Sequence, residues 1–262
     1  MDKIYFLQFI SSLVVGLIVV LILMLPFLNF ALFKKRNDVA DVMWGLSFIA
    51  IGWSTFYYNH NKSHLALVVN ILVSIWGLRL SYHIARRWFR FKEEERRYAD
   101  MRASWKHNEE IKTFFFVFLL QAILALLVSI PVILINTYAV KPNVYAFLGA
   151  ILWLFGFIYE STADMQLKKF VTNPENSGKI METGLFKLSR HPNYFGELSQ
   201  WWGITIMSLF VSYGYIGIIG AITITFLINK VSGVPLSEKR TSQKPGWAEY
   251  SSKTPPIIPK IF

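Results

Sequence analysis

The sequence predicts an all-α membrane protein, a bundle of seven transmembrane helices. Hydrophobic residues make up 54% of the 262 residues and charged residues only 16%, whereas soluble domains carry about a quarter charged residues. The apolar residues also form long runs, near the ~20 residues that cross a bilayer, instead of amphipathic stripes. No linker, repeat or low-complexity tract divides the chain, so we expect one membrane-embedded domain over residues 1–262.

Seven runs are long enough to be spans, and proline or glycine punctuates several of their ends. The first run is too long for a signal-peptide core and lacks a small-residue cleavage site, so it is predicted to be a transmembrane helix. The last two runs are separated only by the short connection "SYGY". In chain order the predicted spans are roughly 5–32, 40–58, 64–85, 113–139, 143–163, 195–212 and 214–231.

The distribution of positive charge predicts the orientation. The net charge of +11 would suggest a nucleic-acid partner in a soluble protein, but here we expect none, because the charges are placed as topology signals. With the N-terminus outside, the outer loops hold Lys3, Lys62 and Lys141, and the other 27 − 3 = 24 Lys and Arg lie on the inner side. This asymmetry predicts an outer N-terminus and a cytoplasmic C-terminus.

Two residue types limit the chemistry. The chain has no cysteine, which excludes disulfides, thiolate nucleophiles and Cys-ligated metal sites. Of the five histidines only His60 and His64 have a helical i, i+4 spacing, and they fall in a predicted outer loop, so no metal site is expected.

Ionisable residues near the predicted inner ends are candidates for a site, because they are costly in a membrane. The loop 86–112 mixes both charge signs with aromatic residues and predicts an interfacial helix, which either covers a cytosolic site or faces lipid headgroups. In the second span Asp38 is placed to cap the helix, whereas Asp41 lies one turn deeper.

Two further spans carry polar faces. Arg79, Tyr82 and two more basic residues recur at i, i+3, i+4 and i+7 of the third span, on one helical face. Arg79 could instead extend to the interface. In the fifth span Glu160, Asp164 and Lys168 are spaced by four, so two carboxylates repel unless a cation or a hydroxyl-rich ligand lies between them.

The stretch "LSRHPNYFGELSQWWG", residues 188–203, opens the sixth span. Pro192 suits the first helical turn, so the helix N-terminus with its free amides faces the cytosol beside Arg190 and His191, which predicts an anion site. Asn193, Glu197 and Trp201 follow on one face at i, i+4 and i+8. This order of phosphate-binding, hydrogen-bonding and aromatic groups matches a nucleotide cofactor, although no G-x-G-x-x-G or P-loop is present.

A family resemblance is carried by "GLFKLSRHPNYFGELSQWWG", the preceding "ADMQLKKFVTNPENSGKIMETG", "DVMWGLSF", "WGLRL" and "SGVPLSEKR…GWAEYSSKTPPIIP". These segments resemble the bacterial branch of the steroid 5-alpha-reductase-like membrane family, most densely from Asp164 to the C-terminus. The resemblance implies a bundle in a bacterial inner membrane, with a cofactor-binding half of about 164–262. It also implies that the protein takes NADPH from the cytosol and reduces an activated C=C bond of a lipid-soluble substrate.

The resemblance also implies site residues. The residues that match cofactor contacts are Asp164, Asn193 and Glu197, with Arg79 for the phosphates, and Lys168 lies one turn after Asp164. Arg190, His191 and Tyr194 belong to the same motif, and Glu238, Arg240 and Tyr250 match a segment that covers the cofactor.

One departure concerns the proton donor. Trp44 and Trp76 fall at or near the places where the steroid reductases carry a glutamate and a tyrosine, so these tryptophans, with Trp201, are expected to line the substrate instead. Asp41 and Tyr82 are the nearest candidates for catalysis, because an enone oxygen needs a hydrogen-bond donor as charge develops on it.

Two alternatives remain open. Membrane methyltransferases of the isoprenylcysteine or phospholipid type share an R-H-P-x-Y-x-G signature and bind S-adenosylmethionine, but they keep paired glutamates where this chain has "SEKR". A transporter or assembly factor would carry polar groups at both membrane faces, whereas the predicted outer halves are almost purely apolar. A monomer or weak homo-oligomer is expected in either case.

Overall fold

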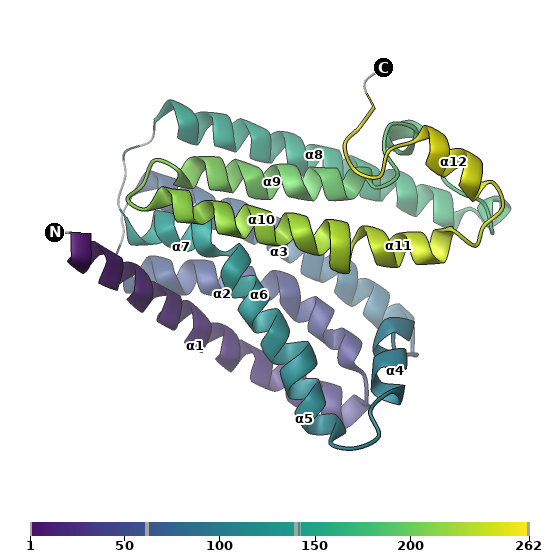
Figure 1. Ribbon diagram of the computed structural model, residues 1–262, viewed down its shortest axis with the longest axis horizontal. Helices are drawn as coiled ribbons and strands as arrows, with labels where there is room; N and C mark the ends of the chain where they lie inside the picture. Colours follow the sequence, from purple (N-terminus) through teal and green to yellow (C-terminus); the bar gives the residue numbers. More distant parts are fainter. Residues whose placement is uncertain (1, 61–62, 139–140, 142, 261–262) are drawn as a thin grey trace. The chain divides into compact units, whose positions relative to one another are not determined.

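The computed structural model describes residues 2–60, 63–138, 141 and 143–260, and these residues contain helices, turns and bends with no strand, as Figure 1 shows. The chain divides into two compact units, which we describe separately. Unit 1 comprises 1–142 and 208–219, and unit 2 comprises 143–207 and 220–262.

Unit 1 is organised around the central helix α2, which packs against both α1 and α3. The bounds are Asp2–Lys34 for α1, Asn37–Val39 for the short 3-10 turn η1, Ala40–Tyr58 for α2 and His64–Arg90 for α3. Gly45 and Gly77 mark the crossing of α2 and α3, since an added Cβ on either would lie within 2.6 Å of the other's carbonyl oxygen. The crossing therefore requires glycine on both helices, as in other close-packed membrane helices.

The rest of unit 1 is a broken helical path. Its elements are α4 (Arg96–Ala103), α5 (Glu109–Thr113), the π-turn η2 (Phe114–Leu119), α6 (Leu120–Val128), α7 (Ile130–Thr137) and η5 (Gly214–Gly217). The predicted continuous span 113–139 is wrong at Ser129, where α6 ends, because Pro131 supplies no amide hydrogen in the first turn of α7. The predicted single helix 86–112 is also wrong, since α3 runs on to Arg90 and separate short helices follow.

A buried polar network joins three helices of unit 1. The Asn70 amide donates to Asn136 Oδ1 at 2.7 Å, and the Asn136 amide donates to Gly52 O at 2.8 Å and to Thr55 Oγ1 at 2.9 Å. Asn70 and Asn136 are 1% and 0% exposed. The outer halves of the predicted membrane spans are therefore less apolar than the sequence suggested.

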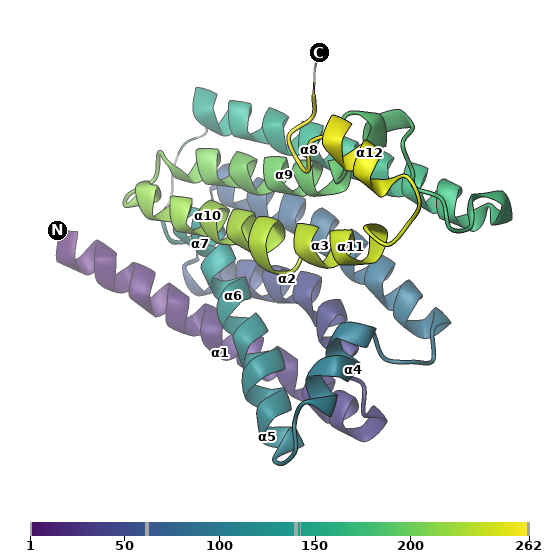
Figure 2. The same ribbon diagram turned by 45° about the vertical axis from the view of Figure 1, so that its right-hand side comes forward.

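Unit 2 contains the long helices α8 and α9, which lie side by side in both views of Figures 1 and 2. Asn143 begins α8 by accepting hydrogen bonds from the amides of Tyr145 and Ala146. In order the elements are α8 (Val144–Thr172), η3 (Pro174–Asn176), η4 (Gly184–Lys187), α9 (Pro192–Ser208), α10 (Ile218–Phe226, its last seven residues in this unit), the π-turn η6 (Leu227–Val231), α11 (Val234–Thr241) and α12 (Trp247–Lys253).

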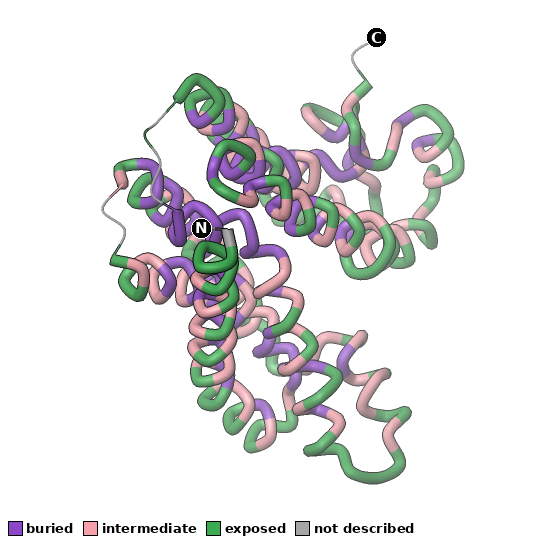
Figure 3. The backbone as a smooth tube through the Cα atoms, turned by 60° about the vertical axis from the view of Figure 1, so that its left-hand side comes forward, coloured by how far each residue is buried: buried purple, intermediate pink, exposed green. Residues whose placement is uncertain are grey.

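Six helical stretches among the described residues are long and apolar enough to cross a membrane, so the protein is a multi-pass membrane protein. They are Lys3–Lys34, Asn37–Tyr58, His64–Arg90, Glu109–Val128, Val144–Thr172 and Gly214–Thr241. Large apolar side chains are exposed along them, as on α1, where Ile4 is 74% and Ile22 61% exposed, and Figure 3 shows long exposed stretches. The seventh predicted span, 214–231, lies within the last of these stretches, and the sixth predicted span, 195–212, corresponds to α9, whose 17 residues are the minimum for crossing.

Candidate functional site

Two pairs of glycines bring α8 and α9 into close contact. A Cβ added to Gly156 of α8 would lie 2.5 Å from Gly196 O of α9. A Cβ added to Gly203 of α9 would lie 2.6 Å from Gly149 O of α8. The glycines are seven residues apart on each helix, so they follow one helical face. The side chains on the flanks of this seam therefore meet across a short gap.

Carboxylates of α8 meet amides of α9 along that seam. The Asn193 amide donates to Asp164 Oδ1 at 3.3 Å, and one turn deeper on α8 the Gln200 amide donates to Glu160 Oε2 at 2.6 Å. Glu160 is 4% and Gln200 1% exposed. The structure thus brings together Asp164 and Asn193, which were each predicted to be site residues.

Gln200 is a residue that the sequence reasoning missed. Its Oε1 atom is buried and has no hydrogen-bond partner among the described residues. The available signal was its spacing of seven from Asn193, which puts both amides on the same side of α9.

The segment before α9 is tied to the C-terminal segment by its backbone. The amide of Arg190 donates to Pro255 O at 2.9 Å, the amide of His191 donates to Pro256 O at 3.0 Å, and Ser189 Oγ donates to Ile257 O at 2.8 Å. Two of the amides predicted to face an anion are therefore used within the protein.

The Arg190 side chain joins three further pieces of unit 2. Its Nε donates to Glu238 Oε1 at 2.8 Å on α11, and its Nη1 donates to Ser251 O at 2.9 Å and to Thr254 O at 2.7 Å. The guanidinium lies 5.5 Å from the centre of the Trp247 ring. Arg190 therefore positions the C-terminal helices around the start of α9.

His191 shares the same carboxylate. Its Nε2 lies 3.2 Å from Glu238 Oε1, and its ring stacks on Tyr194 with centres 5.2 Å apart. Burial lowers the pKa of His191 below its usual value, against the opposing effect of Glu238. His191 is therefore a neutral imidazole near pH 7.

A cavity of about 210 Å³ lies beside these residues. Polar and aromatic groups from the start of α9 and from the C-terminal helices face it, including Asn193, Tyr194 and Trp247, and Lys179 and Lys244 bring positive charge. The volume is below the roughly 300–1,000 Å³ of drug-sized ligand sites.

The remaining predicted residues of unit 2 lie on the same helices. Glu197 is half-buried and Trp201 is 1% exposed on α9, whereas Lys168 at the end of α8 and Arg240 on α11 are exposed. Tyr250 is buried, and its hydroxyl donates to Phe186 O at 2.7 Å. Its role here is to fix α12 to the η4 turn.

Unit 1 holds the other predicted residues, of which Arg79 is half-buried on α3. Trp44 and Trp76 each pack edge-on against Phe48, with ring centres 5.0 and 5.2 Å apart. Tyr82 is 68% exposed and makes no hydrogen bond to Asp41 within the described residues.

Asp41 lies in a polar cluster with α4. Its Oδ1 accepts from the Tyr98 hydroxyl at 2.6 Å and from the Gln121 amide at 3.4 Å, and its Oδ2 accepts from Arg97 Nη2 at 3.0 Å. Burial raises the pKa of Tyr98 well above its usual value, and the Asp41 carboxylate acts in the same direction. Tyr98 therefore keeps its proton. Arg97, Tyr98 and Gln121 were missed because the sequence does not reveal which loop folds over Asp41.

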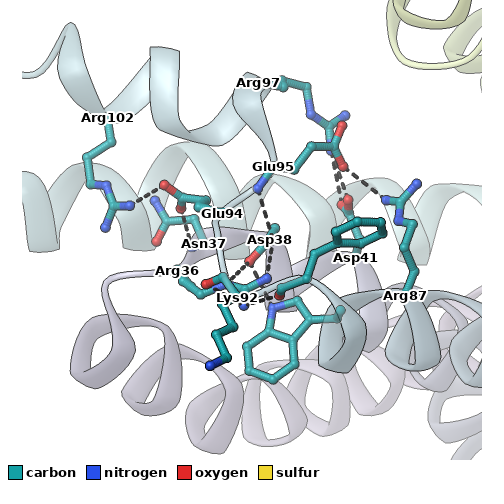
Figure 4. Close-up of polar contacts among 12 residues, drawn as sticks. Arg36, Asn37, Asp38, Asp41, Arg87, Lys92, Glu94, Glu95, Arg97 and Arg102 are labelled. Atoms are coloured by element: carbon teal, nitrogen blue, oxygen red, sulfur yellow. Dashed lines mark hydrogen bonds and ion pairs between the residues drawn. The ribbon is translucent and has the colours of Figure 1, made fainter. Parts of the chain in front are cut away.

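A neighbouring cluster holds the loop after α3, as Figure 4 shows. Asp38 does not cap α2; its carboxylate accepts from Arg36 at 2.8 Å, from Trp88 Nε1 at 2.9 Å and from the Glu95 amide at 3.0 Å. Glu94 accepts from the Asn37 amide and is ion-paired with Arg102. The segment that follows α3 is thus fixed to the η1 turn before α2 by a carboxylate from each segment, Asp38 and Glu94.

Comparison with known proteins gives two results. The model of a family described as a protein of unknown function, DUF1295, matches residues 27–254. The probable O-methyltransferase ustE of Ustilaginoidea virens is 36% identical over 72 residues, which are 28% of this chain and 25% of that protein. The chain thus matches about a quarter of the length of this curated relative.

Proposed function

Since the chain belongs to DUF1295, a steroid 5-alpha-reductase-like membrane family, we propose that it is a membrane reductase that uses NADPH to reduce an activated C=C bond of a lipid-soluble substrate. The observation that carries the proposal is the arrangement at the start of α9. There, a cavity with Lys179 and Lys244 lies next to Asn193, which is paired with Asp164. Cations bind phosphates and carboxylates bind ribose hydroxyls, so the donor set fits a phosphorylated dinucleotide.

When bound, NADPH supplies a hydride; the chain's own residues bind and orient it. Lys179 and Lys244 would attract its phosphates, Asp164 would accept hydrogen bonds from its sugar hydroxyls, and Asn193 would donate one to its sugar oxygens. Arg190 and Glu238 contribute indirectly, because they hold the C-terminal helices against the site. The long apolar helices of the chain exclude water from a lipid-soluble substrate.

The proton donor is proposed to be Tyr82 rather than Asp41. Both Asp41 oxygens accept hydrogen bonds from Arg97, Tyr98 or Gln121, so both are already engaged within the protein. Tyr82 presents an exposed phenol, a donor to a developing oxyanion. Wild-type turnover by Tyr82→Phe with purified protein would remove this residue from the mechanism.

Ligand binding by the purified protein tests the cofactor. We expect NADPH to change the intrinsic protein fluorescence at a lower concentration than NADH does. The double variant Asp164→Asn/Lys244→Gln should bind NADPH more weakly than the wild type. Glu175→Gln, at an exposed residue of η3, is the matched control. No response to either dinucleotide would refute the reductase.

A second candidate is an S-adenosylmethionine-dependent methyltransferase. The observation in its favour is the 72-residue similarity to a probable O-methyltransferase. The cations beside the cavity oppose it, because S-adenosylmethionine carries a sulfonium cation and no phosphate. Binding of S-adenosylmethionine without binding of NADPH would establish this alternative.

A further inference from the structure

Unit 1 contains an apolar groove of about 290 Å³, apart from the site already described. It lies between the end of α1, the start of α2 and the end of α3, and every residue that lines it is apolar. α1 contributes Pro26, Phe27 and Phe30, and α3 contributes Ala85, Trp88 and Phe89. The volume is near the lower bound of ligand pockets, roughly 300 Å³. The groove therefore has room for a segment of a flexible hydrocarbon chain.

One wall of the groove is fixed by polar contacts behind it. Trp88 Nε1 donates to Asp38 Oδ1 at 2.9 Å, and the guanidinium of Arg36 lies 4.2 Å from the centre of the Trp88 ring. The Phe30 ring packs 5.6 Å from the same ring on the α1 side. Because these contacts lock the indole, the groove is preformed.

Positive charge borders the groove at the inner helix ends. Lys34 follows Phe30 by four residues and Phe27 by seven, so it continues the groove-lining face of α1. On α3 Arg86 lies three residues before Phe89. Lys34 and Arg86 are exposed and pair with no carboxylate in the part of the chain that the structure describes.

We propose that this groove binds an anionic phospholipid of the bilayer, with one acyl chain against Trp88 and the phosphate near Lys34 and Arg86. The apolar lining matches an acyl chain, and the two cations match the charge of the headgroup. Arg36 is excluded as a phosphate ligand because its donors are used on Asp38 and on the carbonyl oxygens of residues 91 and 92. The proposal does not depend on the proposed reductase function.

Native mass spectrometry of the full chain, purified with equal amounts of phosphatidylglycerol and phosphatidylethanolamine, tests the proposal. The wild type should retain more phosphatidylglycerol than phosphatidylethanolamine. Lys34→Gln and Arg86→Gln should each lower that preference by about fivefold, since one basic residue near the surface contributes about 1 kcal/mol. The control is the double variant Arg96→Gln/Lys106→Gln, which removes two exposed cations outside the groove.

Filling the groove tests the acyl-chain half separately. Ala85→Leu should reduce retention of both lipids, and Val42→Leu adds less volume and should reduce it less. If Ala85→Leu does not fold, Lys34→Gln and Arg86→Gln still test the proposal through the lipid preference. Equal retention of the two lipids by the wild type, or unchanged preference in Lys34→Gln/Arg86→Gln, would overturn the proposal.

Discussion

At the scale of single residues, Arg190 and His191 show how one short motif organises a unit. Both side chains contact Glu238 Oε1, and both backbone amides bind the C-terminal segment. Arg190 is 13% exposed at its side chain, so its guanidinium is mostly withdrawn from water. The motif therefore stabilises the C-terminal helices as well as bordering the cavity.

We expect Arg190→Gln to lower the free energy of unfolding by about 2 kcal/mol, because it removes the charged partner of the partly buried Glu238 and the donor to two carbonyl groups. Thermal unfolding in detergent measures the change. Lys187→Gln, at an exposed residue of η4, should change stability by less than about 0.5 kcal/mol. Equal stability of the two variants would show that Arg190 has no structural role.

The pKa of His191 gives a pH dependence. Because burial holds this pKa below about 6.5, the unfolded chain binds a proton before the folded chain does as pH falls. Stability should therefore be full above pH 6.5 and fall between the unfolded and the folded pKa. His191→Gln should flatten the thermal unfolding temperature over pH 5–7 relative to wild type; an unchanged profile would contradict this account.

At the scale of elements, the α8–α9 seam determines where the carboxylates and amides meet. The glycines permit a backbone approach that side chains would prevent. Gly196→Val should separate α8 from α9 and lower the free energy of unfolding by about 1–3 kcal/mol. It should also weaken the proposed binding of NADPH at Asp164 and Asn193. Leu154→Ala on α8, where Leu154 is 54% exposed, is the control and should be nearly neutral in thermal unfolding. A Gly196→Val protein as stable as this control would refute the seam.

The asparagine network of unit 1 is a second element-scale feature. Asn136→Ala should cost about 1–2 kcal/mol, since it removes the buried hydrogen bonds of Asn136 with Asn70, Thr55 and the carbonyl oxygen of Gly52. Asn29→Ala is the matched control, because Asn29 is exposed and, among the described residues, its amide bonds to its own helix through Leu25 O. Thermal unfolding of the two variants compares a buried asparagine with an exposed one.

At the scale of the whole molecule, the number of spans decides on which side each end lies. If α9 crosses the membrane, Lys141 lies outside and Lys253 inside; if α9 does not cross, both lie on the same side. The chain has no cysteine, so Lys141→Cys and Lys253→Cys provide single labels. We expect an impermeant maleimide added outside to label only Lys141→Cys in intact cells. Labelling of both would contradict seven spans.

The sequence by itself determined the all-helical membrane class, the helix around each long apolar run and the polar stretch at Pro192. These depend on local composition and periodicity, which act within about 20 residues. The family resemblance singled out both Asp164 and Asn193, and the structure shows that the two side chains lie 3.3 Å apart. The break at Ser129 was missed because the run of apolar residues continues across it.

Only the tertiary structure decided which groups those polar residues meet. The partners of Arg190 are 48 to 64 residues away in sequence, and those of Asp41 are 56 to 80 residues away. Spacing along one helix cannot reveal such contacts, because they depend on how loops return to the helix ends. The tertiary structure therefore showed that Arg190 holds the C-terminal segment, that Asp41 serves as an acceptor, and that Gln200 joins Glu160 in the interior.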